Sequence, residues 1–127
     1  MITAPQPSDG NCLFSCLASF FNKPSINHVV IRRMLVHYIL HNADTFINDI
    51  VAEGYKDVDE YTRHMSQVGQ WGDAIIISAF TMLFNVNVCI SFSESPHDMP
   101  TMISNIPNAP TLALLLNKNH YTRILAW

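Results

Sequence analysis

The sequence predicts an α+β fold in which the helices come first along the chain and the strands come last. Apolar residues recur at helical spacing up to residue 84, whereas β-branched and aromatic residues dominate the segment that follows. Apolar residues make up 49% of the 127 residues and charged residues only 13%. This composition supports a hydrophobic core, and the length fits one compact domain over residues 1–127.

Helical periodicity predicts five helices. The first begins at Asn11, directly after a loop rich in proline and glycine, and should end before Pro24. The last is strongly apolar, follows a loop with two glycines, and has Asp73 in the position of its N-cap. The four later helices are expected over residues 27–41, 46–51, 58–65 and 74–84.

The strands are expected in the last third of the chain. Residues 86–92 are β-branched and aromatic, and residues 112–116 form an aliphatic run long enough for a buried strand. Residues 93–110 contain four prolines and should form a loop. A tight turn at residues 117–119 should lead into a returning hairpin strand over residues 120–127. We therefore expect a small, largely antiparallel sheet.

Charge and cysteine content exclude several classes of protein. The net charge is −3 with no run of like charge, which argues against a nucleic-acid partner. No stretch approaches the roughly 18 apolar residues of a spanning helix, and residues 1–9 lack the pattern of a secretory signal. The odd set of cysteines, Cys12, Cys16 and Cys89, favours a reducing compartment over a disulfide scaffold. We expect a cytoplasmic monomer without a membrane partner.

The segment around Cys12 has the features of a cysteine nucleophile. Cys12 falls in the first turn of a helix, whose unpaired N–H groups lower the pKa of a thiol. Free N–H groups at Asn11 and Cys12 can donate to a developing oxyanion. Gly10 lets the backbone approach a substrate closely, and Asp9 can brace the loop. Taken alone, the competing interpretation is a buried cysteine at a helix start.

His120 is the histidine best placed to serve as the base that a cysteine nucleophile needs. It opens a strand directly after a turn, in a rigid position at the edge of solvent. His37 and His41 share a helix face, but no further ligands complete a metal pair, so a solvated face is favoured. A zinc site at Cys12 and Cys16 lacks a second ligand pair, and Cys16 is expected in the core.

Three segments together resemble the ovarian-tumour (OTU) family of cysteine proteases. Residues 7–14, Pro-Ser-Asp-Gly-Asn-Cys-Leu-Phe, resemble its nucleophile motif. Trp71-Gly72-Asp73 before an apolar helix resembles its Trp-Gly-Gly segment, and Asn119-His120-Tyr121 resembles its histidine motif. The three segments occur in the order of the family and span residues 7–122.

The resemblance implies the OTU variant of the papain-like fold, with helices on a small sheet. The implied activity is hydrolysis of the isopeptide bond after the C-terminal glycine of ubiquitin or a ubiquitin-like protein, with no metal or organic cofactor. Cys12 would be the nucleophile and His120 its base. Asp9 would complete the catalytic group by bracing the oxyanion loop, which Gly10 and Asn11 form or support. The compact length is similar to viral or bacterial members, and for a viral member the host cytoplasm is the expected location.

For several other residues near the motifs the sequence leaves more than one role possible. Trp71, Asn119 and Tyr121 are candidates to line the channel for a ubiquitin tail, although Trp71 is equally suited to anchor its loop in the core. The family often has Asp or Asn two residues after the histidine, where this chain has Thr122. The third member of the triad is therefore Thr122, another group, or absent. Asp73 replaces the second glycine of the Trp-Gly-Gly segment and is expected to cap a helix.

Two other functions remain open at this stage. One is a non-catalytic module that binds ubiquitin with an OTU fold, which the missing acidic partner of His120 suggests. The other is a cysteine protease that cleaves its own polyprotein, because both substrates can present a glycine at the cleavage site.

Overall fold

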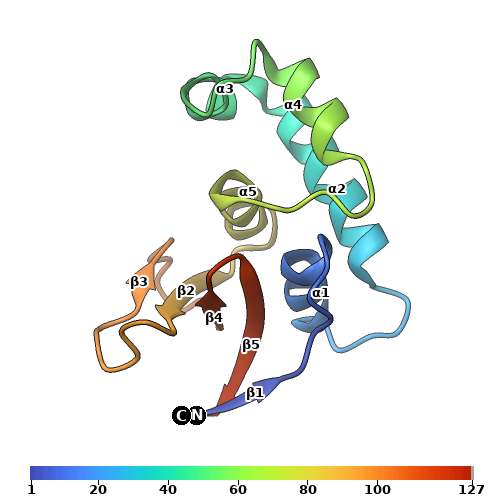
Figure 1. Ribbon diagram of the computed structural model, residues 1–127. Helices are drawn as coiled ribbons and strands as arrows, with labels where there is room; N and C mark the ends of the chain where they lie inside the picture. The colour runs from blue at the N-terminus through green and yellow to red at the C-terminus, as the bar shows by residue number, and fades with distance from the viewer. Residues whose placement is uncertain (127) are drawn as a thin grey trace.

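The structure is a computed structural model that describes residues 1–126. It contains five helices and five strands within that range (Figure 1). In chain order they are β1 (Ile2–Ala4), α1 (Cys12–Ser19), α2 (His28–His41), α3 (Ala43–Ala52), α4 (Val58–Met65), α5 (Ala74–Phe84), β2 (Asn87–Phe92), β3 (Thr101–Met102), β4 (Thr111–Asn117) and β5 (His120–Ala126).

The helices and the sheet form an α+β arrangement, as the sequence predicts. The strand order is β1-β5-β4-β2-β3. Helix α1 contacts β5 and helix α5 contacts β2, while α2 packs on both of these helices from the side away from the sheet (Figure 1). Helices α3 and α4 lie farther out, against α2. Helix α1, which carries Cys12, is therefore held directly against the strand that begins with His120.

The sheet is largely antiparallel, as expected, and contains one parallel strand pair. Three strand pairs are antiparallel, but the central pair of β2 and β4 is parallel, with Val88 opposite Leu112. The long connection between β2 and β4 returns the chain to the same end of the sheet and contributes the two-residue strand β3. Strands β1 and β3 were not expected, because two or three residues are too few to show an alternating pattern.

Side-chain caps fix the starts of three helices. The side chains of Asn27, Asp57 and Asp73 accept hydrogen bonds from the backbone N–H groups three residues later, at 3.1, 2.8 and 3.1 Å. Each satisfies an N–H group that the helix itself leaves unpaired. The expected cap at Asp73 is thus confirmed. Helix α1 ends at Ser19, earlier than Pro24 requires, and Asn22 follows in the left-handed region with φ of 51°.

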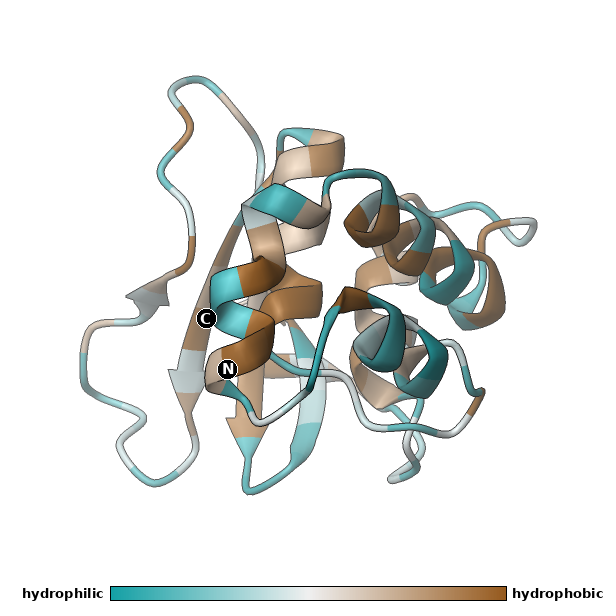
Figure 2. Ribbon diagram, turned by 90° about the horizontal axis from the view of Figure 1, so that it is seen from above, coloured by the Kyte–Doolittle hydropathy of each residue, from teal (hydrophilic) through white to brown (hydrophobic). Residues whose placement is uncertain are grey.

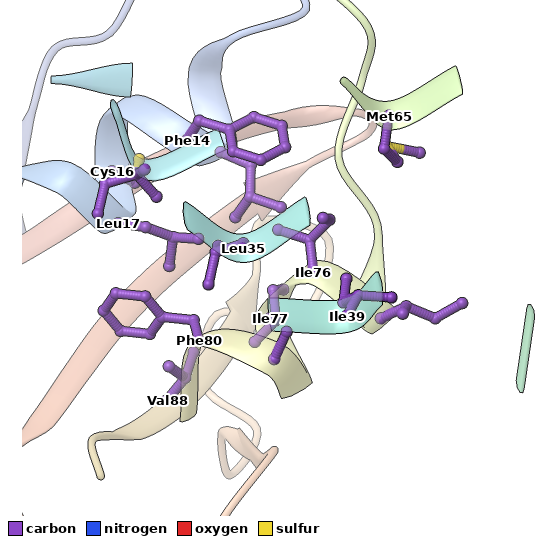
Figure 3. Packing of buried hydrophobic residues seen from close by; sticks show 14 of the residues in the cluster. Phe14, Cys16, Leu17, Leu35, Ile39, Met65, Ile76, Ile77, Phe80 and Val88 are labelled. Carbon is purple, nitrogen blue, oxygen red and sulfur yellow. The ribbon is translucent and has the colours of Figure 1, made fainter. Parts of the chain in front are cut away.

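The core lies between the helices and one face of the sheet. Figure 3 shows Leu35 of α2 among Leu17 of α1 and Ile77 and Phe80 of α5, and all four are fully buried. Several helices carry both hydrophobic and hydrophilic residues (Figure 2), whereas α5 is almost entirely apolar. Cys16 is buried in this cluster, as expected. Among residues 1–126, no helix has the length and apolar character that crossing a bilayer requires.

The burial of Phe80 generates a stability prediction. Its ring makes edge contacts with Phe20 and Phe21 at centroid distances of 6.1 Å each. Truncation to alanine removes these contacts and leaves a cavity, so Phe80→Ala should lower the free energy of unfolding by about 3–5 kcal/mol. Met82→Ala, on the exposed side of the same helix, should change it by less than about 0.5 kcal/mol. Urea unfolding of both variants measures this, and equal losses would place the core elsewhere.

Candidate active site

Cys12 is the first residue of α1 and lies against the backbone on both sides of His120. Its Sγ accepts a hydrogen bond from the N–H of Tyr121 at 3.5 Å and lies 3.9 Å from the carbonyl oxygen of Asn119. Residues far apart in the sequence are thus brought together as the motifs predict. Only 1% of Cys12 is exposed. A substrate carbonyl can therefore reach Sγ only after neighbouring groups move.

The His120 ring forms no hydrogen bond with any of residues 1–126. Its Nδ1 is buried and has no partner. The ring therefore bonds neither to the Cys12 thiol nor to the Thr122 hydroxyl. The sequence left open whether Thr122 is the third member of the triad. In this structure Thr122 is not hydrogen-bonded to the His120 ring. The backbone of His120 is placed by the hairpin, since His120 pairs with Asn117 across a two-residue turn in which Lys118 has φ of 57°.

The pKa of the Cys12 thiol is raised, which is the opposite of what its place at a helix N-terminus predicts. Burial raises the pKa, because the thiolate loses hydration. The N–H groups of Tyr121, Leu13 and Cys12 itself favour the thiolate and lower the pKa, whereas the charge of Asp9 raises it. Burial is the largest of these effects. The environment of Cys12 therefore favours the neutral thiol over the thiolate.

Asp9 braces the loop before Cys12 by accepting two hydrogen bonds. Its carboxylate Oδ1 accepts from the N–H of Asn11 at 2.9 Å, and its carbonyl oxygen accepts from the N–H of Cys12 at 3.3 Å. These are the two N–H groups that the sequence assigns to an oxyanion. Neither is free in this structure, and the bond to Asn11 is the shorter one.

Gly10 has a different role from the one expected. It is buried, and a Cβ added to it would overlap the carbonyl oxygen of Gly69. The missing side chain therefore makes room for a neighbouring loop. We call residues 8–11 the cysteine loop and residues 66–72 the glycine loop. Asn11 joins the two, because its Oδ1 accepts a hydrogen bond from the N–H of Gly69 at 2.7 Å.

Arg32 of α2 also joins the two loops, and sequence reasoning missed it. It is 2% exposed, and its guanidinium lies 3.8 Å from the centroid of the Phe14 ring. Burial lowers the pKa of Arg32, and Nε is buried without a partner among the described residues. The guanidinium donates to four oxygens: Met65 O at 2.8 Å, Gln70 O at 2.8 Å, Asn11 Oδ1 at 3.0 Å and Gly10 O at 3.3 Å.

Two neighbouring hollows lie beside the histidine hairpin. One of about 360 Å³ is lined by Trp71, Gly72, Leu116, Lys118, Asn119 and Tyr121. The other, of about 410 Å³, is lined by Ser8, Trp71, Asn117, Lys118, Asn119 and His120. Trp71 is 40% exposed, so it is a wall of these hollows and not a core anchor. Trp71, Asn119 and Tyr121 thus lie where a substrate segment could be held.

The remaining histidines and cysteines form no second site. The rings of His37 and His41 lie 4.1 Å apart, on the exposed side of α2. No group of three or more potential metal ligands occurs among residues 1–126. Burial raises the pKa of Cys16 to about 12, so this thiol is inert.

Comparison with known proteins gives relatives of one kind. The family model of OTU-like cysteine proteases matches residues 7–120. The OVARIAN TUMOR DOMAIN-containing deubiquitinating enzyme 10 of Arabidopsis thaliana is 31% identical over 93 residues, covering 70% of this chain and 24% of the relative. The OTU domain-containing protein 2 of Saccharomyces cerevisiae is 29% identical over 130 aligned positions, covering 91% of this chain and 40% of the relative.

Solved structures agree with these relatives. The OTU domain of OTUD1 superimposes with a TM-score of 0.83 at 23% identity, covering 98% of this chain and 85% of that domain. The Hazara virus OTU bound to ubiquitin gives a TM-score of 0.78 at 20% identity, covering 98% and 82%. The fold is therefore the OTU type of the papain-like architecture. Together with the family match over most of its length, this shows that the chain belongs to the family of OTU-like cysteine proteases.

Proposed function

We propose that this chain is a cysteine-dependent isopeptidase that hydrolyses the bond after the C-terminal glycine of ubiquitin or a ubiquitin-like protein. The observation that carries the proposal is the contact of Cys12 Sγ with the backbone on both sides of His120, in a chain of the OTU family. The chain spans only 24% and 40% of the two curated relatives described above. An OTU domain bound to ubiquitin among the similar structures supports ubiquitin as the partner.

The state of the thiol favours one of two ways to form the nucleophile. Because the pKa of Cys12 is raised, a standing ion pair with His120 is disfavoured at neutral pH. In the proposed first step the ring of His120 turns toward Cys12 and takes its proton as Sγ attacks the carbonyl carbon. The unpartnered Nδ1 supports this motion, since no hydrogen bond to residues 1–126 holds that atom.

The first step places a negative charge on the carbonyl oxygen. The carboxylate of Asp9 already places an anionic oxygen 2.9 Å from the N–H of Asn11, the distance that an oxyanion would adopt. In the proposed mechanism the substrate oxygen replaces Asp9 as the acceptor, and the N–H of Cys12 is a second donor. Asp9 then acts as a brace that yields to substrate, and not in proton transfer.

The remaining steps return the enzyme to its starting state. Collapse of the tetrahedral intermediate breaks the bond to the lysine amine, which leaves with the proton held by His120. His120 then takes a proton from water, whose oxygen attacks the thioester carbon. Collapse of this second intermediate breaks the bond to Sγ, and the proton of His120 returns to the thiolate. Each step balances without a metal or an organic cofactor.

The two hollows beside the histidine hairpin support a channel for an extended tail. Trp71 and Asn119 line both hollows, and Tyr121 lines one of them. A tail that ends in glycine fits between such walls because glycine has no side chain to exclude. The three unpaired cysteines support a reducing compartment such as the cytoplasm, and nothing in the proposed mechanism requires a second subunit.

A non-catalytic ubiquitin-binding module is the second candidate. Two observations favour it: Cys12 is almost completely covered, and the His120 ring has no hydrogen bond to residues 1–126. Such a module would hold ubiquitin without cleaving it. The experiment that tests turnover therefore includes a measurement of binding.

Cleavage of a panel of ubiquitin dimers tests the proposed reaction. Wild-type protein should release monomer, and Cys12→Ala should reduce the rate to background because no thiol remains to attack. Cys89→Ala, on β2 and away from the site, should keep the wild-type rate. Gel densitometry measures the rates, and calorimetry measures ubiquitin binding by each protein. Binding without cleavage by wild-type protein would establish the non-catalytic module instead.

The pH dependence of alkylation tests the state of the thiol. Only the thiolate reacts with iodoacetamide, so the rate at Cys12 should rise through a midpoint above the pKa of an ordinary cysteine. Asp9→Asn removes a charge that raises this pKa while keeping an acceptor oxygen, so it should move the midpoint down. Mass spectrometry of the Cys12 peptide follows the reaction. A rate that is already constant below pH 7 would contradict the neutral thiol and favour an ion pair.

A further inference from the structure

Arg32 is a buried cation whose hydrogen bonds reach two separate loops and the last residue of α4. Its acceptors in the cysteine loop are Gly10 O and Asn11 Oδ1, and its acceptor in the glycine loop is Gln70 O. All of its acceptors are carbonyl or amide oxygens, so no carboxylate offsets its charge through these bonds. Burying a charge in this way is costly. A buried arginine can nevertheless be kept, because its planar guanidinium orients several acceptors in a way that other side chains cannot.

The bond from Arg32 to Gly10 O has a direct consequence for the next N–H group. The carbonyl of Gly10 and the N–H of Asn11 belong to one peptide plane, and the chain has no cis peptide. In a trans peptide the two groups point in opposite directions. Because Gly10 O points at the buried Arg32, the N–H of Asn11 must point away from it, and it reaches the exposed carboxylate of Asp9.

We propose that Arg32 is a positioning residue that fixes the plane of the Gly10–Asn11 peptide and so aims the Asn11 N–H at the oxyanion of the reaction. This inference rests on the proposed function, because it assigns Asn11 N–H as a donor to that oxyanion. Arg32 does not touch the substrate. It acts through Gly10 and Asn11, and it holds the glycine loop against them through Gln70.

Other contacts of the same peptide support this role. Asn11 Oδ1 accepts from both Arg32 and the N–H of Gly69, so the side chain and the main chain of Asn11 are fixed together. Gly10 cannot shift toward the glycine loop, because its Cα already lies against Gly69. The guanidinium also packs on the Phe14 ring, with Cζ 3.8 Å from the ring centroid. If Arg32 were removed, the contacts that remain would still let the Gly10–Asn11 peptide rotate.

Lysine and methionine at position 32 separate charge from geometry. Arg32→Lys keeps the positive charge but loses the planar fork that reaches both loops. Arg32→Met keeps an unbranched chain of similar length without a buried charge, so it avoids the cost of burying a cation. Ile39→Ala is the matched control, because Ile39 is fully buried two turns along the same helix and lies in the core cluster. This substitution should destabilise the core, but it removes no hydrogen bond to either loop.

Turnover of a fluorogenic ubiquitin substrate is the first readout. It is measured at a temperature at which circular dichroism shows that each variant is folded. Both Arg32 variants should lose kcat on the order of 100-fold, the effect of one lost oxyanion donor, with a smaller change in KM. Ile39→Ala should keep the wild-type kcat. The pH midpoint of kcat/KM should stay at its wild-type position, because Arg32 acts on the peptide and is not among the groups that shift the pKa of Cys12.

Amide proton shifts provide a second readout that does not depend on activity. In both Arg32 variants the shifts of Asn11 and Gly69 should move as their hydrogen bonds loosen, whereas Ser15, bonded to Asn11 O at 2.9 Å within α1, should keep its shift. If wild-type protein has no turnover, the proposed function fails, and these shifts still test whether Arg32 fixes the peptide.

Four results would overturn the inference. They are an unchanged kcat in a folded Arg32 variant, a raised KM with unchanged kcat, a pH midpoint displaced by about one unit or more, and unchanged amide shifts at Asn11 and Gly69. Failure of both Arg32 variants to fold while Ile39→Ala folds would also overturn it, since Arg32 would then serve stability alone.

Discussion

The site depends on one close contact, in which the cysteine loop and the glycine loop meet at Gly10 and Gly69 with no room for a Cβ. This contact lets Asn11 Oδ1 reach the N–H of Gly69 and brings both loops within reach of Arg32. The start of α1, and with it Cys12, takes its position from the cysteine loop. The glycine loop ends at Trp71 and Gly72, so the same contact also places one wall of the substrate hollows. The proposed nucleophile, oxyanion donor and channel wall thus all take their positions from the docking of two short loops.

The opposite side of the site is set by the sheet. Strand β5 begins with His120, and its next N–H, from Tyr121, binds Cys12 Sγ at 3.5 Å. The carbonyl of Tyr121 accepts a hydrogen bond from Cys16 one turn along α1, so the helix and the strand are held together at two levels. The contact with β5 buries the Cys12 thiol, and burial raises the pKa of that thiol. In the proposed mechanism, Cys12 is therefore firmly placed but needs a base and a small movement before it reacts.

Much of this could be predicted from the sequence, because the relevant signals are local. Asp73 before an apolar run marks a helix start, and the Asp-Gly-Asn-Cys motif with a distant His120 points to the catalytic pair proposed above. The rest depends on tertiary contacts that no local pattern records. The direction of the Cys12 pKa shift follows from burial by β5, and the partner of Gly10 comes from a loop far along the chain. Arg32 stands three residues before Leu35 and seven before Ile39, on their buried face, and that spacing is the one signal that distinguishes it from Arg33.

The most direct test of loop docking is the rate at which Cys12 is captured by ubiquitin carrying an electrophilic C-terminus, compared between wild type and Gly10→Ala. A methyl group at Gly10 would force the two loops apart, so we predict capture slower by on the order of 100-fold, with the helical content of the core retained. Gly54→Ala is the control, because a Cβ added at Gly54 would meet no atom within 4 Å, and this variant should react at the wild-type rate. Intact-mass measurement of the adduct gives both rates. Capture of Gly10→Ala at the wild-type rate would contradict the account, because the nucleophile would then be positioned without the docked loops.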